Sequence, residues 1–142
     1  MELRSTTTTR PRDLASIGLV GGSVLLTLAT SYIHSTLGGL LFTLNALGYA
    51  ALAVALVVTI GLADRFRWLI RLALLGFTLA TIAGWLAFGA RYDVAYLSKA
   101  IEAVLVALLV VSIYRFDEGP AGVVARLQKL PGDLVGLLRG GR

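Results

Sequence analysis

The 142-residue sequence contains no cysteine and a single histidine, and both shortages exclude classes of chemistry. Without cysteine there is no disulfide framework, thiol nucleophile, iron–sulfur ligation or cysteine zinc site. One histidine is too few for a pair of axial haem ligands or a histidine metal cluster, so we expect no metal and no cofactor. Phosphate-binding glycine loops, G-x-S-x-G elbows and H-E-x-x-H helices are also missing, and we expect a protein that is not an enzyme.

Charged residues are scarce as well, at 15% of the chain against 57% hydrophobic residues. A soluble domain of this size could not enclose so much apolar surface in its core. The net charge of +5 comes from short basic clusters between apolar stretches and not from one basic stripe. We therefore expect anionic lipid head groups as the partner of these clusters, and no nucleic acid.

Four charge-poor runs are long enough to cross a bilayer core of about 30 Å as helices. We place these spans at about 14–33, 37–63, 68–89 and 94–114. Pro11 and Asp13 precede the first span, and Ser35 and Asp93 are expected to cap the second and the fourth. The predicted fold class is an all-α integral membrane protein, with a four-transmembrane-helix bundle over 14–116 between tails at 1–13 and 117–142.

The distribution of lysine and arginine predicts that both termini lie in the cytoplasm. Of the 13 basic residues only Arg91 and Lys99 fall on the opposite side. Arg71, one turn inside the third span, is expected to extend back to the inner head groups. Aromatic residues mark the same two levels, with Phe66, Trp68, Tyr114 and Phe116 inside and Tyr32, Trp85, Phe88, Tyr92 and Tyr96 outside. The pattern is typical of a small bacterial multispan protein of the cell (inner) membrane.

The first span has an alternative interpretation as a cleaved signal peptide. Basic residues precede a moderately apolar stretch there, as they do in secretory signals. The small residues around Ala29 make a poor cleavage site, and the apolar run is long for such a signal. A membrane span is therefore favoured.

The chain after the fourth span has two interpretations. Gly119-Pro120 is expected to stop the fourth helix, and apolar residues then recur at helical spacing over 121–130. With Arg126 and Lys129 on another side, this segment predicts a short amphipathic helix on the inner leaflet. A second amphipathic fragment is expected at 134–138, after Pro131-Gly132. A fraying tail is the alternative, because so short a helix needs a surface to dock on.

Glu102 is the leading candidate functional residue, because an acid near the bilayer midplane is costly and usually functional. Lys99 lies three positions earlier on the same helical face, so the two can pair. The helical rise per residue places Asn45 and Thr81 near the depth of Glu102 in the membrane, and Thr27 a little closer to the outer surface. If all faces point inward, these residues form a polar layer. Its outer mouth would carry His34, interpreted as an interface residue, and Arg91.

Three interpretations of this polar layer are open. It can be a satisfied network that fixes how the helices pair. It can be a water-accessible pocket in which Glu102 exchanges protons or binds a cation beside Lys99. It can also be a docking face for another membrane subunit, a lipid or a quinone-like cofactor.

Small residues mark a helix-packing stripe on the third span. Gly76, Ala80 and Gly84 are spaced four apart, which allows two helix backbones to approach closely in lipid. Packing within the four-helix bundle is the favoured explanation, and contact with another protein chain is the second.

Two functional hypotheses of different classes follow. The first is a non-enzymatic accessory, assembly or interaction subunit of the plasma membrane, whose partner is another membrane protein or a second copy. The alternative is a small proton- or cation-coupled transporter or channel that uses Glu102 with Lys99.

Overall fold

The computed structural model describes residues 14–58 and 66–139, with their side chains except those of 133, 134 and 136–139. Within these residues all regular structure is helical. The helices are α1 (Leu14–Thr36), α2 (Leu40–Val58), α3 (Arg67–Phe88), α4 (Asp93–Phe116) and α5 (Gly119–Arg139). Each of α1 to α4 is long and apolar enough to cross a membrane. The predicted helical bundle with four candidate membrane spans is confirmed.

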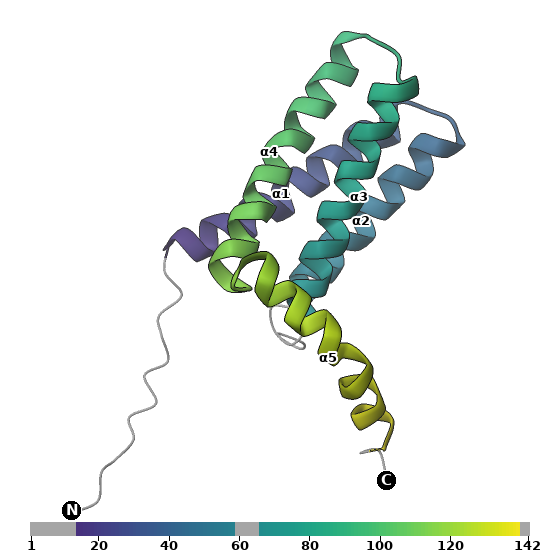
Figure 1. The fold of residues 1–142 in the computed structure, drawn as a ribbon. Coiled ribbons are helices and arrows are strands. Elements are labelled where there is room, and N and C mark those ends of the chain that lie inside the picture. Colours follow the sequence, from purple (N-terminus) through teal and green to yellow (C-terminus); the bar gives the residue numbers. More distant parts are fainter. Residues whose placement is uncertain (1–13, 59–65, 140–142) are drawn as a thin grey trace, which may run out of the picture.

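The four long helices run up and down side by side (Figure 1). Each contacts its neighbours in the chain, and α1 also contacts α4, so that the bundle closes. The starts of α1 and α3 and the end of α4 lie at one end of the bundle, where α5 turns away. We call this the α5 end. The connections at 37–39 and 89–92 lie at the opposite end.

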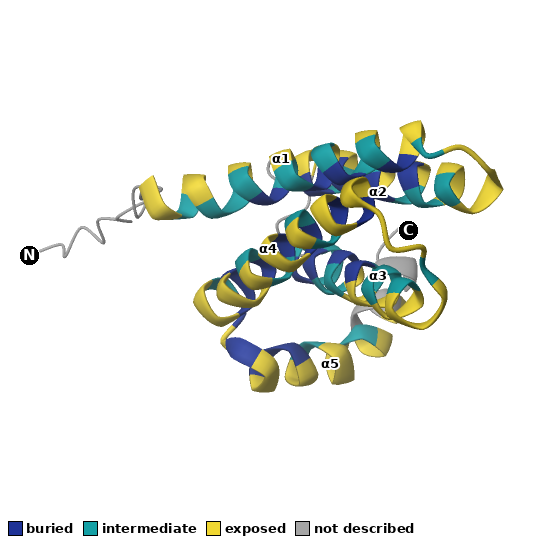
Figure 2. Ribbon diagram, turned by 90° about the horizontal axis from the view of Figure 1, so that it is seen from above, coloured by how far each residue is buried: buried dark blue, intermediate teal, exposed yellow. Residues whose placement is uncertain are grey.

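Buried residues lie where the helices face one another (Figure 2), and many large apolar side chains are exposed on the outside of the bundle. The main core cluster consists of Tyr49, Leu56, Leu74, Leu105 and Leu109. The buried polar or charged side chains are Ser23, Thr27, Thr30, His34, Arg71, Thr78, Ser98, Glu102, Ser112 and Asp117. Polar groups inside and large apolar groups outside are the arrangement that a lipid environment favours.

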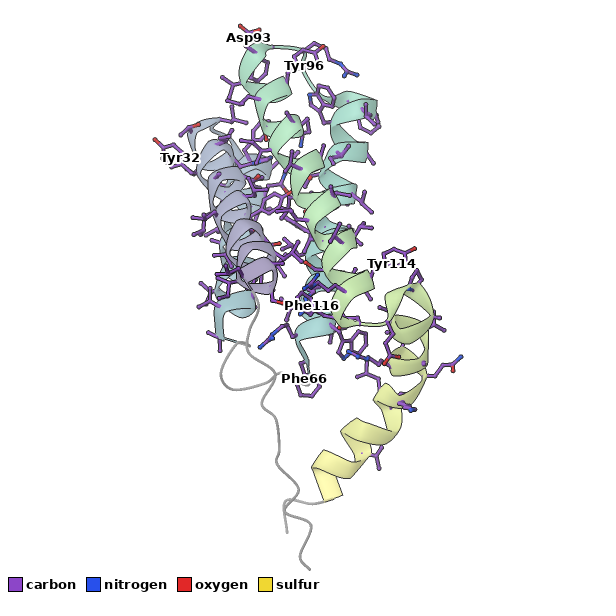
Figure 3. All side chains as sticks on the ribbon, turned by 90° about the vertical axis from the view of Figure 1, so that its left-hand side faces the viewer. Tyr32, Phe66, Asp93, Tyr96, Tyr114 and Phe116 are labelled. Atoms are coloured by element: carbon purple, nitrogen blue, oxygen red, sulfur yellow. The ribbon has the colours of Figure 1, made fainter. Side chains whose placement is uncertain are left out.

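Aromatic side chains gather at two levels of the bundle, as the sequence suggested. In Figure 3, Tyr32 and Tyr96 lie toward the end with the connections, near Asp93. Phe66 and Phe116 lie toward the α5 end in the same view. Aromatic rings at both ends of apolar helices are the usual anchors at lipid–water interfaces.

The first connection lies later in the chain than expected. The Ser35 hydroxyl donates to the Tyr32 carbonyl at 2.6 Å, so this serine belongs to α1 and does not cap the next span. Gly38 and Gly39 make the reversal with φ of 70° and 87°, a left-handed conformation that glycine adopts without steric penalty. The second helix consequently begins at Leu40. Its expected end at 63 lies outside the described residues.

The other two spans agree with expectation to within two residues at each end. Asp93 is the first residue of α4 and not its cap, since Tyr92 occupies the cap position without a side-chain hydrogen bond. The acidic side chain still lies in the first turn of the helix, where it interacts favourably with the free N–H groups.

The helix after the fourth span is longer than predicted. The reversal is made by Glu118 and Gly119, with φ of 61° and 70°, so Gly119-Pro120 begins α5. Pro120 lies in the first turn, where its missing N–H leaves no helical bond unmade. The two fragments expected on either side of Pro131 form one helix, because an internal proline removes a single N–H bond and the flanking turns persist.

Candidate functional site

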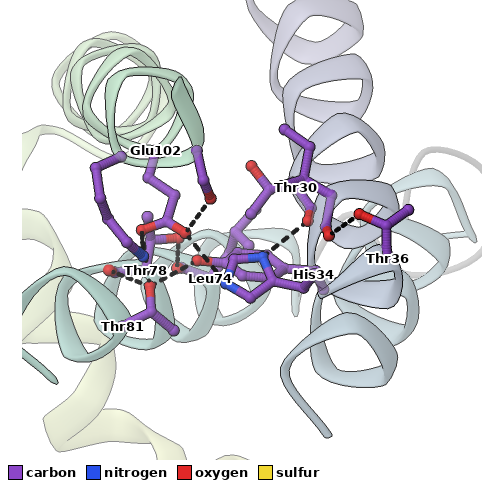
Figure 4. A network of polar contacts seen from close by, with 11 residues as sticks. Thr30, His34, Thr36, Leu74, Thr78, Thr81 and Glu102 are labelled. Atoms are coloured by element: carbon purple, nitrogen blue, oxygen red, sulfur yellow. Dashed lines mark hydrogen bonds and ion pairs between the residues drawn. The ribbon is translucent and has the colours of Figure 1, made fainter. Parts of the chain in front are cut away.

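Glu102 lies at the centre of a polar network buried between the helices (Figure 4). Its side chain is 0% exposed. Lys99 Nζ donates to Oε2 at 2.6 Å, and Oγ1 of Thr81 lies 3.0 Å from the same oxygen. Thr81 shares its single hydroxyl hydrogen between this oxygen and the Thr78 carbonyl, which lies 2.8 Å away. The Ser98 hydroxyl donates to Oε1 at 3.4 Å. One ammonium and two hydroxyls thus offset part of the cost of burying the carboxylate.

The structure brings the predicted Lys99–Glu102 pair together through helix geometry alone. The two residues are three positions apart on α4 and therefore share a face. The Lys99 side chain is 12% exposed, so its ammonium sits at the edge of the buried region.

His34 approaches Glu102 from the last turn of α1. The ring is buried, and Nε2 lies 3.7 Å from Oε1 of Glu102. The Tyr49 ring packs beside it with centroids 5.6 Å apart. Thr27, Thr30 and His34 share the inward face of α1, so the histidine is a member of the polar network and not only a residue at the end of the helix.

The position of one hydrogen on His34 follows from its second contact. Nδ1 lies 2.9 Å from the carbonyl oxygen of Thr30, and a carbonyl can only accept, so Nδ1 carries a hydrogen. In the neutral ring Nε2 is then an acceptor, and it faces a carboxylate oxygen of Glu102, which is also an acceptor. A proton bound to either atom removes this repulsion.

Tyr49 and Thr81 extend the network to α2 and α3. The Tyr49 hydroxyl lies 2.9 Å from Oγ1 of Thr81, which in turn lies 2.8 Å from the Thr78 carbonyl. We call the whole set the Glu102 network; its members are His34, Tyr49, Thr81, Ser98, Lys99 and Glu102. It links all four long helices and so fixes their rotation relative to one another.

Two residues expected in the polar layer do not bond to Glu102. The Thr27 hydroxyl donates to a carbonyl of its own helix at 2.6 Å. Asn45 is half-buried on α2 and is not among the hydrogen-bond donors to Glu102 in the described residues. Thr27 and Asn45 were selected by depth, and depth along a helix does not determine which face a side chain occupies. Arg91, expected at the outer mouth, is exposed in the connection after α3, with its guanidinium 4.2 Å above the Trp85 ring.

Two members of the network were missed as site residues in the sequence. Ser98 precedes Glu102 by four positions, which places both on one helix face. Tyr49 lies in the middle of an apolar span, away from the interfaces where tyrosine is common. A hydroxyl at that depth needs a hydrogen-bond partner. A tyrosine in the middle of an apolar span can therefore be recognised from the sequence as a candidate site residue.

A second ionic cluster lies at the α5 end. The buried Asp117 carboxylate accepts hydrogen bonds from Arg71 at 2.5 Å and from Arg126 at 3.0 Å. Arg71 also lies over the Phe116 ring at 4.9 Å. The expectation that Arg71 extends to lipid head groups is wrong, because the end of α4 offers it a buried carboxylate. Arg71, Asp117 and Arg126 form the Asp117 cluster, which joins α3, α4 and α5.

The predicted packing stripe of α3 faces away from the bundle. Gly76, Ala80 and Gly84 are all exposed, and a Cβ built on either glycine meets nothing within 4 Å. The favoured explanation was packing inside the bundle, but the stripe makes no such contact with the described residues. Close approach occurs at Gly48 instead, where a Cβ would lie 2.6 Å from Cζ of Phe77.

Six of the exposed residues of α3 are alanine or glycine, beside the exposed Leu79, Leu86 and Phe88. Between residues 73 and 87 every exposed residue is alanine or glycine except Leu79 and Leu86. We call this the α3 small-residue face; it comprises Ala73, Gly76, Ala80, Ala83, Gly84 and Ala87. In contrast, the large residues exposed on α2 are Leu40, Leu41, Leu44, Leu47, Val54, Val57 and Val58. The two helices thus present different surfaces to their surroundings.

Comparisons with protein-family models, with curated proteins and with solved structures find no match to this chain. The function has to be inferred from the residues themselves. Among the residues that the structure describes, no three His, Asp or Glu side chains gather in a way that could hold a metal ion.

Proposed function

We propose that this chain is a non-enzymatic accessory, assembly or interaction subunit that binds another membrane protein, or a second copy of itself, through the α3 small-residue face. The exposed run of alanine and glycine between Ala73 and Ala87 carries this proposal. Helices in lipid associate through close backbone approach, which small residues permit. Glycine inside a helix costs about 1 kcal/mol relative to alanine, and a contact from outside the chain would offset that cost.

In this proposal the protein lies in the bacterial plasma membrane with both termini in the cytoplasm. The basic residues support that orientation, since among the described residues Arg67, Arg71, Arg115, Arg126, Lys129 and Arg139 belong to the starts or ends of helices at the α5 end or to α5 itself, and only Arg91 and Lys99 do not. α5 then lies on the inner leaflet as an amphipathic helix. Its exposed Val124 and Leu127 support this placement, because they would contact acyl chains.

The Glu102 network has a structural role under the same proposal. Side-chain bonds that link four helices hold α3 at one rotation, and the small residues then face outward together.

The decisive experiment compares Ala80→Leu with Ala51→Leu, an equal change at an exposed position on α2. Oligomeric state and co-purified membrane proteins are measured in mild detergent and by cross-linking in membranes. We expect Ala80→Leu to weaken association by about tenfold or more, because the added side chain separates the backbones. Ala51→Leu should behave like the parent. The proposal fails if the parent is a bare monomer in several gentle conditions, or if both variants associate as the parent does.

A second candidate function is a small proton- or cation-coupled transporter or channel. One observation favours it: Nε2 of His34 and Oε1 of Glu102 are acceptors that face each other at 3.7 Å. A proton bound there would change the net charge of His34, Lys99 and Glu102 from zero to +1. Such a change at membrane depth can be coupled to transport.

Flux measurements in liposomes test this candidate. Glu102→Gln removes the charge and should abolish a proton or cation flux while the protein still folds. Asp93→Asn is the matched control, since it makes the same change at an exposed acid at the start of α4. Equal flux in the parent and in Glu102→Gln would exclude this function.

A further inference from the structure

The Asp117 cluster holds more positive than negative charge. Oδ2 of Asp117 pairs with Arg71 at 2.5 Å and Oδ1 pairs with Arg126 at 3.0 Å. One carboxylate balances one guanidinium, so a unit of positive charge is left over. Among the side chains that the structure describes, Asp117 is the acid that pairs with Arg126.

The surplus charge belongs to Arg126, because the two arginines differ in exposure. Arg71 is buried over the Phe116 ring, and among the described residues its ion pair is with Asp117. The Arg126 side chain is 39% exposed and donates to Asp117 through Nη1 alone. A guanidinium has five N–H donors, so Arg126 can bind a second anionic oxygen without leaving Asp117.

The two flanks of α5 have the two properties of a helix that binds lipid head groups at a membrane surface. Lys129 is exposed one helical turn beyond Arg126, which places a second cation near the first. On the other flank of α5, Val124 and Leu127 are 51% and 42% exposed. The cations favour a phosphate, and the apolar side chains favour contact with the acyl chains of the leaflet in which that phosphate lies. A soluble phosphate would use only the first of these properties.

We infer that Arg126, assisted by Lys129, binds the phosphate of an anionic phospholipid, while Val124 and Leu127 on the other flank of α5 hold the helix at the surface of that leaflet. The site rests on the proposed placement of α5 on a leaflet of the membrane. The ligand group is a phosphodiester, and it is bound by the guanidinium of Arg126, which Asp117 positions. Asp117 keeps Arg126 at a fixed place while leaving its charge uncompensated.

Trp68 provides a local probe of this site, since it packs with Val123 of α5. The chain has two tryptophans, so Trp85→Phe leaves Trp68 as the single fluorophore. The protein is reconstituted twice in the same mixture of phosphatidylglycerol and phosphatidylcholine. In one sample the phosphatidylglycerol is brominated on its acyl chains, in the other the phosphatidylcholine, and the brominated lipid quenches nearby tryptophan. The ratio of Trp68 quenching in the two samples gives the lipid preference near Trp68. We expect a preference of about fivefold for phosphatidylglycerol.

Arg126→Gln should reduce this preference to about onefold, and Arg126→Lys should retain most of it. Arg91→Gln is the matched control, because it removes an exposed arginine at the other end of α3 and should leave the Trp68 result unchanged. Inorganic phosphate, added to the same vesicles at constant ionic strength, should not compete. A parent without preference, a preference that survives Arg126→Gln, or full competition by inorganic phosphate would each overturn the inference.

The outcomes separate this inference from the proposals on which it rests. Equal quenching of Trp68 by both brominated lipids rejects the Arg126 site but keeps the α5 end at the bilayer. Absence of quenching by either lipid rejects the placement of α5, and the lipid site with it. Neither result changes the comparison of Ala80→Leu with Ala51→Leu, which reports on the α3 small-residue face.

Discussion

Nε2 of His34 on α1 and Oε1 of Glu102 on α4 lie 3.7 Å apart in the buried centre of the bundle. Because Nδ1 of His34 bonds to the Thr30 carbonyl, Nε2 of a neutral ring is an acceptor that faces a carboxylate oxygen. The contact joins the first and the last of the four long helices. It is also where the two functional hypotheses diverge, since a fixed network needs no proton there and a transporter does.

The hydrogen on His34 can be observed directly, because the chain has a single histidine. We predict that nitrogen NMR of histidine-labelled protein at neutral pH shows a hydrogen on Nδ1, since this atom donates to a carbonyl at 2.9 Å. Glu102→Gln should leave that assignment unchanged, because the Thr30 carbonyl lies within the same helix. A neutral ring with its hydrogen on Nε2 would contradict the proton site.

Lys99 and Glu102 should show strong coupling in a double-mutant cycle. Glu102→Gln and Lys99→Met should each lose about 3 kcal/mol or more of unfolding free energy, because each leaves a partner charge without compensation. The double variant should recover much of this loss. The unfolding free energies of the four proteins are measured in detergent, with heat or a denaturant as the means of unfolding.

Thr27→Val serves as the control for this cycle, because Thr27 is buried but bonds only within α1. Its effect should add to that of Lys99→Met to within about 0.5 kcal/mol. Single variants nearly as stable as the parent would mean that water reaches Glu102. The transporter hypothesis would then take first place.

Gly48→Ala and Gly76→Ala should change stability in opposite directions. A Cβ at Gly48 would lie 2.6 Å from the Phe77 ring, which packs edge-on against Tyr49 and cannot move without disturbing it. We expect a loss of about 1–3 kcal/mol there. Gly76 has open space, so alanine should stabilise the protein by about 0.5–1 kcal/mol. Thermal unfolding of the two variants checks both signs, and a gain at Gly48 would refute the packing described.

Asp117→Asn should destabilise the α5 end far more than Arg126→Gln. Loss of the carboxylate leaves the buried Arg71 without a counter-ion, at a cost of about 3–5 kcal/mol. Arg126 is partly exposed to its surroundings, so its removal should cost about 0.5–1 kcal/mol. Unfolding curves give the first quantity, and limited proteolysis within α5 reports whether that helix stays docked. Equal losses would show that Arg126 is as essential to folding as the acid.

Helix positions could be predicted closely from the sequence, because a span of lipid requires a long run without charge. The exceptions depended on backbone conformation. Ser35 and Pro120 both carry helix-boundary chemistry, but Gly38, Gly39 and Glu118 with Gly119 make the actual reversals through positive φ. A capping residue only permits a boundary, and a left-handed residue imposes one.

The sequence by itself determined the four apolar spans, the two aromatic levels and the pairing of Lys99 with Glu102. These are local properties, set by run length and by the spacing of residues along one helix. Tertiary structure alone decided that His34 reaches Glu102, that Arg71 turns inward to Asp117, and that the small residues of α3 point outward. Each of these depends on how far a helix is rotated about its axis. Rotation is set by contacts between helices, and a largely apolar helix leaves it almost unspecified.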